Sequence, residues 1–426
     1  MNILLVQAYL GGKEPPIFPL GLSCLVSSIK GHNLKVVDTN VLSNYLVELS
    51  ELLNNFNPDL IGLSLRNIDS TNKRKVIFYY SYLKKIIDVI KAGPSQKSKI
   101  VIGGSGFSMF AHEIMQDEPR IDYGIFLEGE NTFPNLLNHL DSPVAIRGVF
   151  FRENGKVVFT GPNNQVNLTD ISFPEKNLVP LEPYLNIPEA IGVETKRGCA
   201  LGCIYCIYGF LNGKNYRLKE PVKVVDEIES LVLDMNVKSF TFVDSVFNLP
   251  LSHAEAICKE IIKRGLTVSW SAWFHEGYLN KDFFDLLINA GCKKIILSPD
   301  GFSDDVLRKL GKTIKMEDIL RVYDILKSVN GIEVCYNFFK NPPGQNVITF
   351  LKLMAFYIKV KVRMKNRVHF EFNSLRIEPH TPLFKIAVKE GLIKNTDNLL
   401  FPVYYTNKKS YFIEILFNGF LKILGK

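Results

Sequence analysis

Three cysteines lie within eight residues of one another, and their spacing constrains this chain more than any other feature of its sequence. Cys199, Cys203 and Cys206 form a Cys-x3-Cys-x2-Cys pattern directly after a strand expected at 190–194. Three thiolates on one short loop can bind three irons of a cubane [4Fe–4S] cluster, which is normally held by four cysteines. The fourth iron is then open to a substrate or a cofactor. Gly198 and Gly202 leave the loop backbone free to wrap around such a cluster.

A structural zinc site and three unrelated buried thiols are the alternative interpretations of this pattern. A structural zinc site has four ligands, and no fourth Cys or His follows at zinc-finger spacing. Cys258, Cys292 and Cys335 are scattered, which does not suit a second cluster. An odd total of seven cysteines, in a chain whose N-terminus does not read as a secretion signal, favours reduced thiols and a cytoplasmic protein.

Length and composition are those of an ordinary globular protein. The 426 residues leave room for two or three domains, and 46% apolar with 22% charged residues argues against extensive disorder. A formal net charge of +8 is a small excess of the kind that solvated faces carry, so we expect no nucleic-acid partner. No window reaches the ~18 apolar residues that a membrane span requires.

The first part of the chain alternates short apolar strands with helices. Strands are expected at 2–8, 34–37, 59–65, 100–103 and 123–126. Helices are expected at 20–30, after the second strand as far as about 53, and at 73–91. Nearly continuous apolar strands separated by helices predict a parallel, doubly wound sheet of the Rossmann-like kind. Such a sheet binds its ligands at the carboxyl ends of its strands.

The second part of the chain repeats the strand–helix alternation after an interruption. Asn154-Gly155 between two apolar runs predicts a hairpin, and the Pro-rich residues up to 188 read as a linker. Six strands then follow, at 190–194, 239–243, 268–272, 294–297, 332–338 and 368–373. Six βα units predict an open, partial barrel rather than a closed eight-fold one. The expected division is therefore 1–144 for the first domain, 145–188 for hairpin and linker, 189–391 for the barrel and 392–426 for a small helical extension.

The cysteine pattern resembles that of the radical SAM superfamily, and the resemblance covers roughly residues 189–391. Tyr205 precedes the third cysteine, as an aromatic often does in that family. The segments 242–248, 291–312 and 337–344 are similar to later parts of the family's barrel. The resemblance implies that the open iron binds S-adenosylmethionine and that one electron then releases a 5′-deoxyadenosyl radical. It also implies an external low-potential electron donor of the flavodoxin or ferredoxin type.

The resemblance assigns further cofactor contacts to polar residues at the strand ends, where Asp and Asn are also ordinary caps and turn formers. These candidates are Tyr205, Asp244, Asn248, Ser298, Asp300, Asn337 and Arg376. Lys340 and Asn341 stand where the family commonly has a glycine, which weakens the expectation of adenine contacts there. The cluster of Trp270, Trp273, Phe274 and His275 at the third barrel strand is interpreted as either packing or a substrate wall.

The doubly wound domain ahead of this barrel resembles the cobalamin-binding branch of the family, which includes C- and P-methyltransferases. The alternatives are an NAD-type fold and a domain that binds nothing. The glycines follow the fourth strand and not the first, so the position of the usual NAD-type fingerprint is empty. The expected cobalamin contacts are Ser64, Arg66, Asn67, Gly103, Gly104, Gly106, Glu128 and Gly129. None of the seven His lies in an Asp-x-His-x-x-Gly pattern, so cobalt should lack the usual protein imidazole. Arg66 is expected either to shield the lower face of cobalt or to pair with Asp69 or a phosphate.

The expected function is a cobalamin-dependent radical SAM methyltransferase. The resemblance implies that methylcobalamin, lying between the two domains, methylates an unactivated carbon or phosphorus centre of a natural-product, peptide or lipid intermediate after the 5′-deoxyadenosyl radical has removed a hydrogen. A radical SAM cyclase or rearrangement enzyme is the alternative, and a non-catalytic cobalamin and Fe–S carrier or sensor is the alternative of another class. The apolar segment 411–424 is expected to pack on the barrel, or to make peripheral contact with a membrane or a lipid-like substrate.

Overall fold

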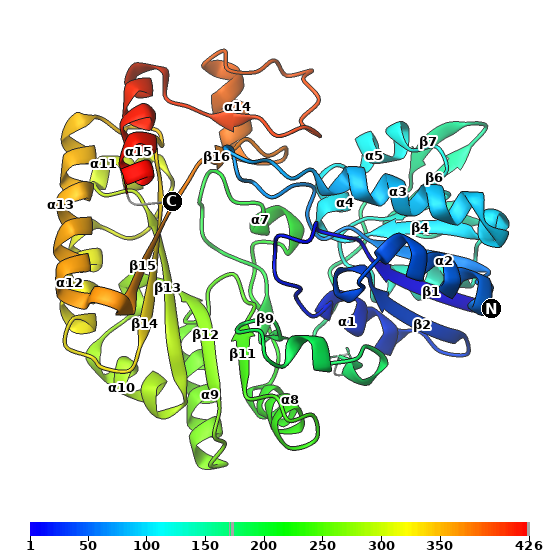
Figure 1. The fold of residues 1–426 in the computed structure, drawn as a ribbon, viewed down its shortest axis with the longest axis horizontal. Coiled ribbons are helices and arrows are strands. Elements are labelled where there is room, and N and C mark those ends of the chain that lie inside the picture. Colours follow the sequence, from blue (N-terminus) through cyan, green and yellow to red (C-terminus); the bar gives the residue numbers. More distant parts are fainter. Residues whose placement is uncertain (170, 172–173, 424–426) are drawn as a thin grey trace. The chain divides into compact units, whose positions relative to one another are not determined.

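The protein is described by a computed structural model that covers residues 1–169, 171 and 174–423. The chain divides into two compact units, of which the first comprises Met1–Ile191 with Asn398–Pro402 and the second Gly192–Asp397 with Val403–Lys426. Each unit is built around its own sheet, and the elements are labelled in Figure 1.

The first unit contains a seven-stranded sheet with the order β2-β1-β3-β4-β5-β6-β7. Its strands are β1 (Asn2–Gln7), β2 (Asn33–Asp38), β3 (Leu60–Ser64), β4 (Lys99–Gly103), β5 (Tyr123–Ile125), β6 (Val149–Glu153) and β7 (Lys156–Phe159). The first five are parallel, and β6 and β7 are antiparallel. β1 pairs with both β2 and β3, so right-handed crossovers place α1 and α2 on opposite faces of the sheet. The predicted doubly wound sheet is confirmed.

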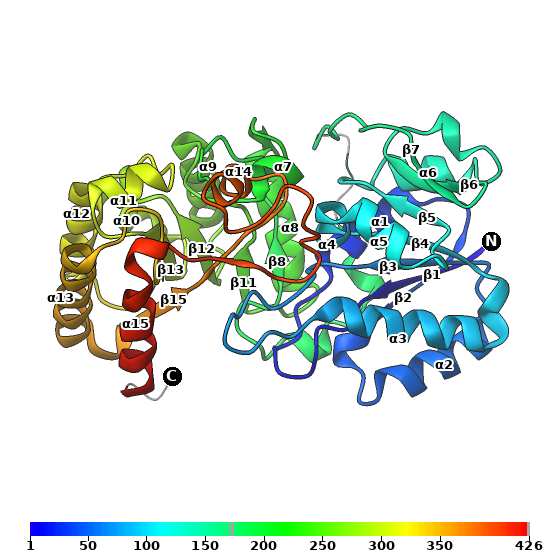
Figure 2. The same ribbon diagram turned by 90° about the horizontal axis from the view of Figure 1, so that it is seen from above.

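The first three helices of the first unit correspond to the three predicted ones, with the start of α3 shifted, whereas α4, α5 and α6 were not predicted. They are α1 (Leu20–Ser28), α2 (Tyr45–Phe56), α3 (Tyr79–Ala92), α4 (Ser105–Met109), α5 (Ala111–Asp117) and α6 (Thr132–Leu137), with short 3-10 turns between them. Figure 2 shows α2 and α3 side by side along the sheet. Helix α3 begins at Tyr79 and not at Lys73, because Ser70 and Ile77 close the preceding residues into a loop through Ser70 N to Ile77 O (2.9 Å) and Ile77 N to Ser70 Oγ (3.0 Å).

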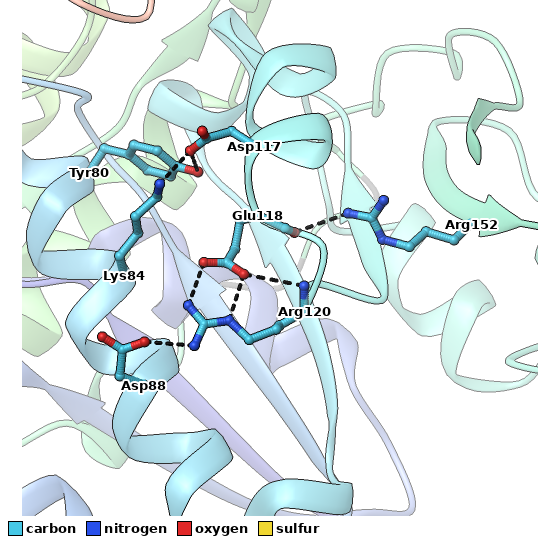
Figure 3. A network of polar contacts seen from close by, with 7 residues as sticks. All are labelled: Tyr80, Lys84, Asp88, Asp117, Glu118, Arg120 and Arg152. Carbon is cyan, nitrogen blue, oxygen red and sulfur yellow. Dashed lines mark hydrogen bonds and ion pairs between the residues drawn. The ribbon is translucent and has the colours of Figure 1, made fainter. Parts of the chain in front are cut away.

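A network of charged side chains ties α3 to α5 and to β6 (Figure 3). Asp117 accepts from Tyr80 Oη at 2.9 Å and pairs with Lys84 at 2.6 Å. One turn of α3 further on, Arg120 bridges Asp88 and Glu118, and Arg152 of β6 donates to the backbone oxygen of Glu118. These bonds fasten the antiparallel end of the sheet to its helical layer.

The predicted hairpin extends this sheet. Glu153 and Lys156 are register partners, and Asn154 and Gly155 between them both have positive φ, at 49° and 77°. Two positive φ values are the signature of the type I′ turn that two-residue hairpins prefer.

The second unit contains a six-stranded parallel sheet with the order β15-β14-β13-β12-β11-β8. Its strands are β8 (Gly192–Val193), β11 (Ser239–Phe242), β12 (Ser269–Phe274), β13 (Cys292–Asp300), β14 (Glu333–Phe339) and β15 (Val368–Asn373). The short pairs β9 (Lys196–Arg197) with β10 (Arg217–Leu218), and β16 (Leu375–Arg376) with β17 (Tyr404–Tyr405), lie outside it. β8 and β15 are not paired with each other, so the barrel is open as predicted.

Helices cover the outer face of this open barrel (Figure 1). They are α8 (Pro221–Leu233), α9 (Leu251–Lys263), α10 (Lys281–Asn289), α11 (Asp304–Lys309), α12 (Met316–Leu326) and α13 (Val347–Met364), with α7 (Tyr208–Leu211), α14 (Pro382–Lys389) and α15 (Tyr411–Ile423) added at the ends. Alternation along β14 shows the two faces: Tyr336 and Phe338 are fully buried against Phe356 of α13, whereas Asn337 and Phe339 are half-buried on the inner face.

Candidate functional site

The three motif cysteines lie on one loop between β9 and α7, at the carboxyl end of β8. The loop is fixed by backbone hydrogen bonds from Cys199 N to Gly213 O (3.0 Å), from Ile204 N to Leu310 O (3.0 Å) and from Leu383 N to Ile204 O (2.8 Å). Cys199 is buried, and the thiols of Cys203 and Cys206 are close enough to interact electrostatically with it and with each other. The loop therefore presents its three sulfurs to one region of the barrel.

Two glycines are required by the way this loop packs. A Cβ at Gly198, which has φ +97°, would lie 2.0 Å from Asn215 O. A Cβ at Gly311, which has φ +73°, would lie 2.3 Å from Gly202 O. The cysteine loop thus rests backbone to backbone on the turn that carries Gly311 and Lys312.

A buried polar cluster joins the cysteine loop to the ends of β13 and β14. Asp300 accepts a hydrogen bond from the Tyr205 hydroxyl and forms an ion pair with Lys312. Lys312 Nζ also donates to Ser298 O at 2.6 Å and lies 5.5 Å from the centroid of the Tyr205 ring. Asn337 Nδ2 lies 3.3 Å from Ser298 Oγ. Four of the residues singled out from the sequence are therefore brought together, and Lys312 completes the cluster.

The chemistry of the cysteine loop fits a cluster more than a single metal ion. Across the described residues, no three His, Cys, Asp or Glu side chains are arranged to hold one ion. In a [4Fe–4S] cluster each thiolate binds a different iron, so the sulfurs need not converge on one point. Burial raises the pKa of the Cys206 thiol to about 12, and burial likewise raises the pKa of Cys203, with Lys312 acting in the opposite direction on both. Binding of iron would therefore displace protons from these thiols.

Asp244 and Asn248 lie in the interior, where this chain's own groups use their polar atoms. Asp244 accepts from the backbone N of Thr195 (2.9 Å) and of Lys196 (3.2 Å), and pairs with Lys196 Nζ at 2.8 Å. Both members of that ion pair are almost completely buried. Asn248 donates to His275 O at 3.0 Å and accepts from His275 N at 2.8 Å. In this structure the two residues hold the backbone around the cysteine loop and at the end of β12.

Arg376 is also engaged within the protein. Its guanidinium is buried and forms an ion pair with Glu378 at 2.6 Å. Nearby, the rings of Phe210 and His380 stack at 4.1 Å, which connects α7 to the segment that follows β16. Lys340 and Asn341, which stand where a glycine is common in the family, anchor the C-terminal segment. Asn341 Nδ2 donates to Asn407 O and to Ser410 O. Lys340 Nζ donates to Asn418 Oδ1.

The end of β12 carries two titratable groups, of which the sequence marks His275 as part of an aromatic cluster and does not mark Glu276. His275 Nε2 lies 2.7 Å from Thr313 Oγ1, and burial together with the Lys312 charge lowers the pKa of the ring to about 4. Glu276 is 3% exposed, its Oε1 has no hydrogen-bond partner among the described residues, and burial raises its pKa to about 7. Trp270 and Phe274 are core residues, whereas Trp273 is 38% exposed at the register position of Ile296.

The cobalamin candidates lie along the carboxyl edge of the first sheet. Arg66 and Asn67 are exposed just beyond β3, and Ser64 is half-buried at its end. Arg66 forms no hydrogen bond or ion pair through its side chain with a described residue, so the expected pairing with Asp69 is not present. Glu128 Oε2 accepts from Val166 N at 2.7 Å, and Gly129 lies against Leu25.

The glycines of this edge allow a close approach of the chain to itself. A Cβ at Gly104, which has φ +99°, would lie 2.6 Å from Leu65 O, and one at Gly106 would lie 2.9 Å from the Asn67 carbonyl carbon. A Cβ at Gly103 would meet nothing closer than 3.7 Å. The loop after β4 therefore packs on the loop that carries Arg66. No His directly follows β1, β3, β4 or β5. The residues at this edge of the sheet therefore fit cobalamin that is held without an imidazole ligand from the protein.

Two protein-family profiles match the chain. The B12 binding domain matches residues 9–137, and the radical SAM superfamily matches residues 193–357. The chain is also 23% identical over 385 residues to an uncharacterised methyltransferase of Pyrococcus horikoshii, covering 88% of this chain and 79% of the relative. It is 27% identical over 244 residues to the anaerobic magnesium-protoporphyrin IX monomethyl ester cyclase of Rubrivivax gelatinosus, and spans 44% of that relative.

Solved structures share the fold. The radical S-adenosylmethionine methyltransferase TsrM of Kitasatospora setae aligns with a TM-score of 0.79 and 22% identity over 96% of this chain and 81% of that one. The cobalamin-dependent S-adenosylmethionine radical enzyme OxsB aligns with a TM-score of 0.76 and 17% identity over 98% of this chain and 65% of that one. The chain therefore has a B12 binding domain on its first sheet and a radical SAM domain on its second, which confirms the predicted pair of domains.

Proposed function

We propose that this enzyme transfers a methyl group from S-adenosylmethionine to an unactivated carbon or phosphorus centre of a small molecule, a peptide or a lipid-like intermediate. The observation that carries the proposal is the three-cysteine loop in a chain that also has a B12-binding domain without an imidazole ligand. When bound, the cluster with S-adenosylmethionine supplies a 5′-deoxyadenosyl radical, and cobalamin supplies a transferable methyl group. The protein contributes position and exclusion of water.

The residues divide the work between the two domains. Cys199, Cys203 and Cys206 would hold the cluster, and Ser298 and Asn337 on the inner face of the barrel would contact S-adenosylmethionine. Tyr205, Asp300, Asp244, Asn248 and Arg376 would act by positioning, since their polar atoms already bind the chain's own groups. Ser64, Arg66, Asn67 and the loops of Gly103, Gly104, Gly106, Glu128 and Gly129 would hold cobalamin.

We assign residues 1–144 to cobalamin, 145–188 to hairpin and linker, 189–391 to the radical SAM barrel and 392–426 to the extension. An external flavodoxin- or ferredoxin-type protein would supply the electron.

The seven cysteines form no disulfide, which suits a reducing compartment such as the cytoplasm. Every helix in the described part of the chain is either too short or too polar to span a bilayer.

The test uses S-adenosylmethionine that carries a trideuterated methyl group. The anaerobically reconstituted enzyme, with cobalamin and dithionite, is incubated with small-molecule extract of cells that contain it. Metabolites that gain the deuterated methyl only with active enzyme identify the substrate. Ring formation is the second candidate, because the cyclase named above is a relative. It predicts 5′-deoxyadenosine without S-adenosylhomocysteine and no transfer of the label.

A further inference from the structure

Helix α13 presents an apolar stripe to solvent. Val347, Ile348, Leu351, Ile358 and Val362 are 43%, 66%, 58%, 56% and 72% exposed. From Ile348 the stripe continues at intervals of three or four residues through Ala355, which is also exposed. This is the spacing of one helix face. The opposite face of α13 is buried against the barrel, so packing of the fold does not use the exposed apolar side chains of the stripe.

Helix α15 extends the apolar surface. Its inner face is anchored by Ile413, Phe417 and Leu421, and the rings of Phe350 and Phe417 meet at 4.8 Å, which places the helix beside α13 (Figure 2). Its outer face exposes four apolar side chains, Tyr411, Phe412, Ile415 and Leu416, each between 47% and 58% exposed. Val347 of α13 and Phe412 of α15 line one cavity, so the two exposed faces meet at the helix starts.

Positive charge lies along one side of this surface. The segment 347–367 contains six basic and no acidic residues, and Lys352, Lys359 and Arg363 are exposed along one side of the stripe. A two-fold dimer through the stripe would bring these like charges together without an acidic partner on the helix, which is unfavourable. An anionic membrane surface suits both the apolar stripe and the basic side chains, because it takes up apolar side chains and attracts lysine and arginine.

The cavity at the helix starts suits a phosphate. It measures about 770 Å³ and is lined by Lys309, Lys408 and Lys409. Gln345, directly before α13, is 4% exposed and also lines the cavity, and its Nε2 has no hydrogen-bond partner among the described residues. Glu390 is present too, with Oε2 accepting from the Tyr405 hydroxyl at 3.0 Å. Lys309 pairs with Asp305 at 2.7 Å, and Lys408 Nζ donates to Glu390 O at 3.4 Å, so Gln345 Nε2 is the buried donor left without a partner among the described residues that line this cavity. That buried amide, the nearby ammonium groups and the positive start of α13 favour an anion.

We propose that the surface of α13 and α15 binds an anionic phospholipid membrane, with the helices lying on the bilayer and a headgroup phosphate in this cavity. Four basic residues within α13 prevent the helix from crossing. The enzyme would thereby act where lipid-like substrates are present, although the proposal does not depend on the substrate.

The test is co-sedimentation of the full chain with vesicles of phosphatidylcholine alone or mixed with phosphatidylglycerol. Binding should require phosphatidylglycerol and weaken at high salt. Ile348→Glu should reduce it more than tenfold, whereas Leu233→Glu, which changes charge equally at a site 68% exposed on α8, should not. Lys352→Gln, Lys359→Gln and Arg363→Gln should each reduce it by up to about fivefold, as should Lys408→Gln with Lys409→Gln.

Three outcomes overturn the proposal. One is failure of the wild type to bind phosphatidylglycerol vesicles, and another is equal loss in Ile348→Glu and Leu233→Glu. The third is a stable dimer in analytical ultracentrifugation that Ile348→Glu dissociates, since that result would assign the surface to a second copy of the chain.

Discussion

Lys312 and Asp300 form an ion pair in which the two side chains are only 12% and 6% exposed. Burial alone would lower the pKa of Lys312, but the Asp300 carboxylate raises it, so the ammonium remains charged. Burial acts on Asp300 in the direction of a higher pKa, and Lys312 and Tyr205 oppose that effect. We assign the pair as charged, with Asp300 at φ 65° held in place by both partners. The pair connects the cysteine loop to the end of β13.

Removal of the ammonium should therefore destabilise the barrel strongly. Lys312→Met leaves Asp300 as an uncompensated buried carboxylate, and we expect a loss of about 3–5 kcal/mol in the free energy of unfolding. The control is Lys309→Met, which breaks the half-exposed pair with Asp305 and should cost at most about 1 kcal/mol. Urea unfolding of the iron-free proteins gives both values, and equal losses would contradict the assignment.

Asp244 offers an independent test of how the cysteine loop is supported. Because its carboxylate binds Thr195 and Lys196, three residues before Cys199, Asp244→Ala should reduce iron content after anaerobic reconstitution as well as stability. Asp244→Asn keeps an acceptor for the backbone N–H groups and should retain more iron. Asp226→Ala removes a 46% exposed carboxylate from Arg264 and should leave iron content unchanged. A full complement of iron in Asp244→Ala would refute this role.

The fold was predictable to a large extent because both sheets are parallel and buried. Continuous apolar runs such as 2–7 and 99–103 leave little doubt about strands, and Asn154-Gly155 determines a turn by backbone chemistry alone. The predicted start of α3 was wrong because residues 73–78, whose sequence is compatible with a helix, are held in a loop by Ser70 and Ile77. Such a boundary depends on local hydrogen bonds that no periodicity reveals.

The candidate site was predictable where chemistry is local in sequence, and less so where it depends on packing. The three thiols share one loop, so their spacing was sufficient. Lys312 and Glu276 were missed because nothing near them in the chain distinguishes a buried charge from an exposed one. Asp244 is recognisable in the sequence as a polar residue at a strand end. Its partners Thr195 and Lys196 precede it by about fifty residues, so only the folded chain brings them together.

Glu276 should make stability depend on pH. Burial raises its pKa from 4.5 to about 7, so between these values the unfolded chain has lost a proton that the folded protein retains. The Glu276 carboxyl group alone should lower the free energy of unfolding as pH rises through this window. His275, whose pKa is lowered from 6.5 to about 4, acts in the opposite direction, so the prediction concerns the difference between wild type and Glu276→Gln. Glu276→Gln removes the effect, and between pH 4.5 and 8 the variant should gain on the order of 3 kcal/mol relative to the wild type. His275 contributes equally to both proteins. Parallel pH curves would show that Glu276 is not protonated in the folded state.

Arg66 should shield bound cobalt. Its guanidinium is exposed at the carboxyl edge of the first sheet and has no lone pair for a metal. We expect bound cob(II)alamin to show no nitrogen hyperfine splitting and no water ligand in its paramagnetic resonance spectrum. Arg66→Ala should admit water and shift the spectrum, Arg66→Lys should shift it less, and Arg147→Ala, elsewhere in the first unit, should not. Nitrogen splitting in the wild type would falsify the shielding role.

The central claim is that the cysteine loop and the B12-binding domain act in one radical methyl transfer, and the most direct measurement quantifies both products of S-adenosylmethionine by mass spectrometry. Enzyme carrying about four irons per chain, with cobalamin, dithionite and substrate extract, should form 5′-deoxyadenosine and S-adenosylhomocysteine in comparable amounts. Cys203→Ala should form no 5′-deoxyadenosine, whereas Cys258→Ala, which removes a buried thiol of α9, should form both products. Undiminished 5′-deoxyadenosine from Cys203→Ala, or neither product from fully loaded wild type, would contradict the account.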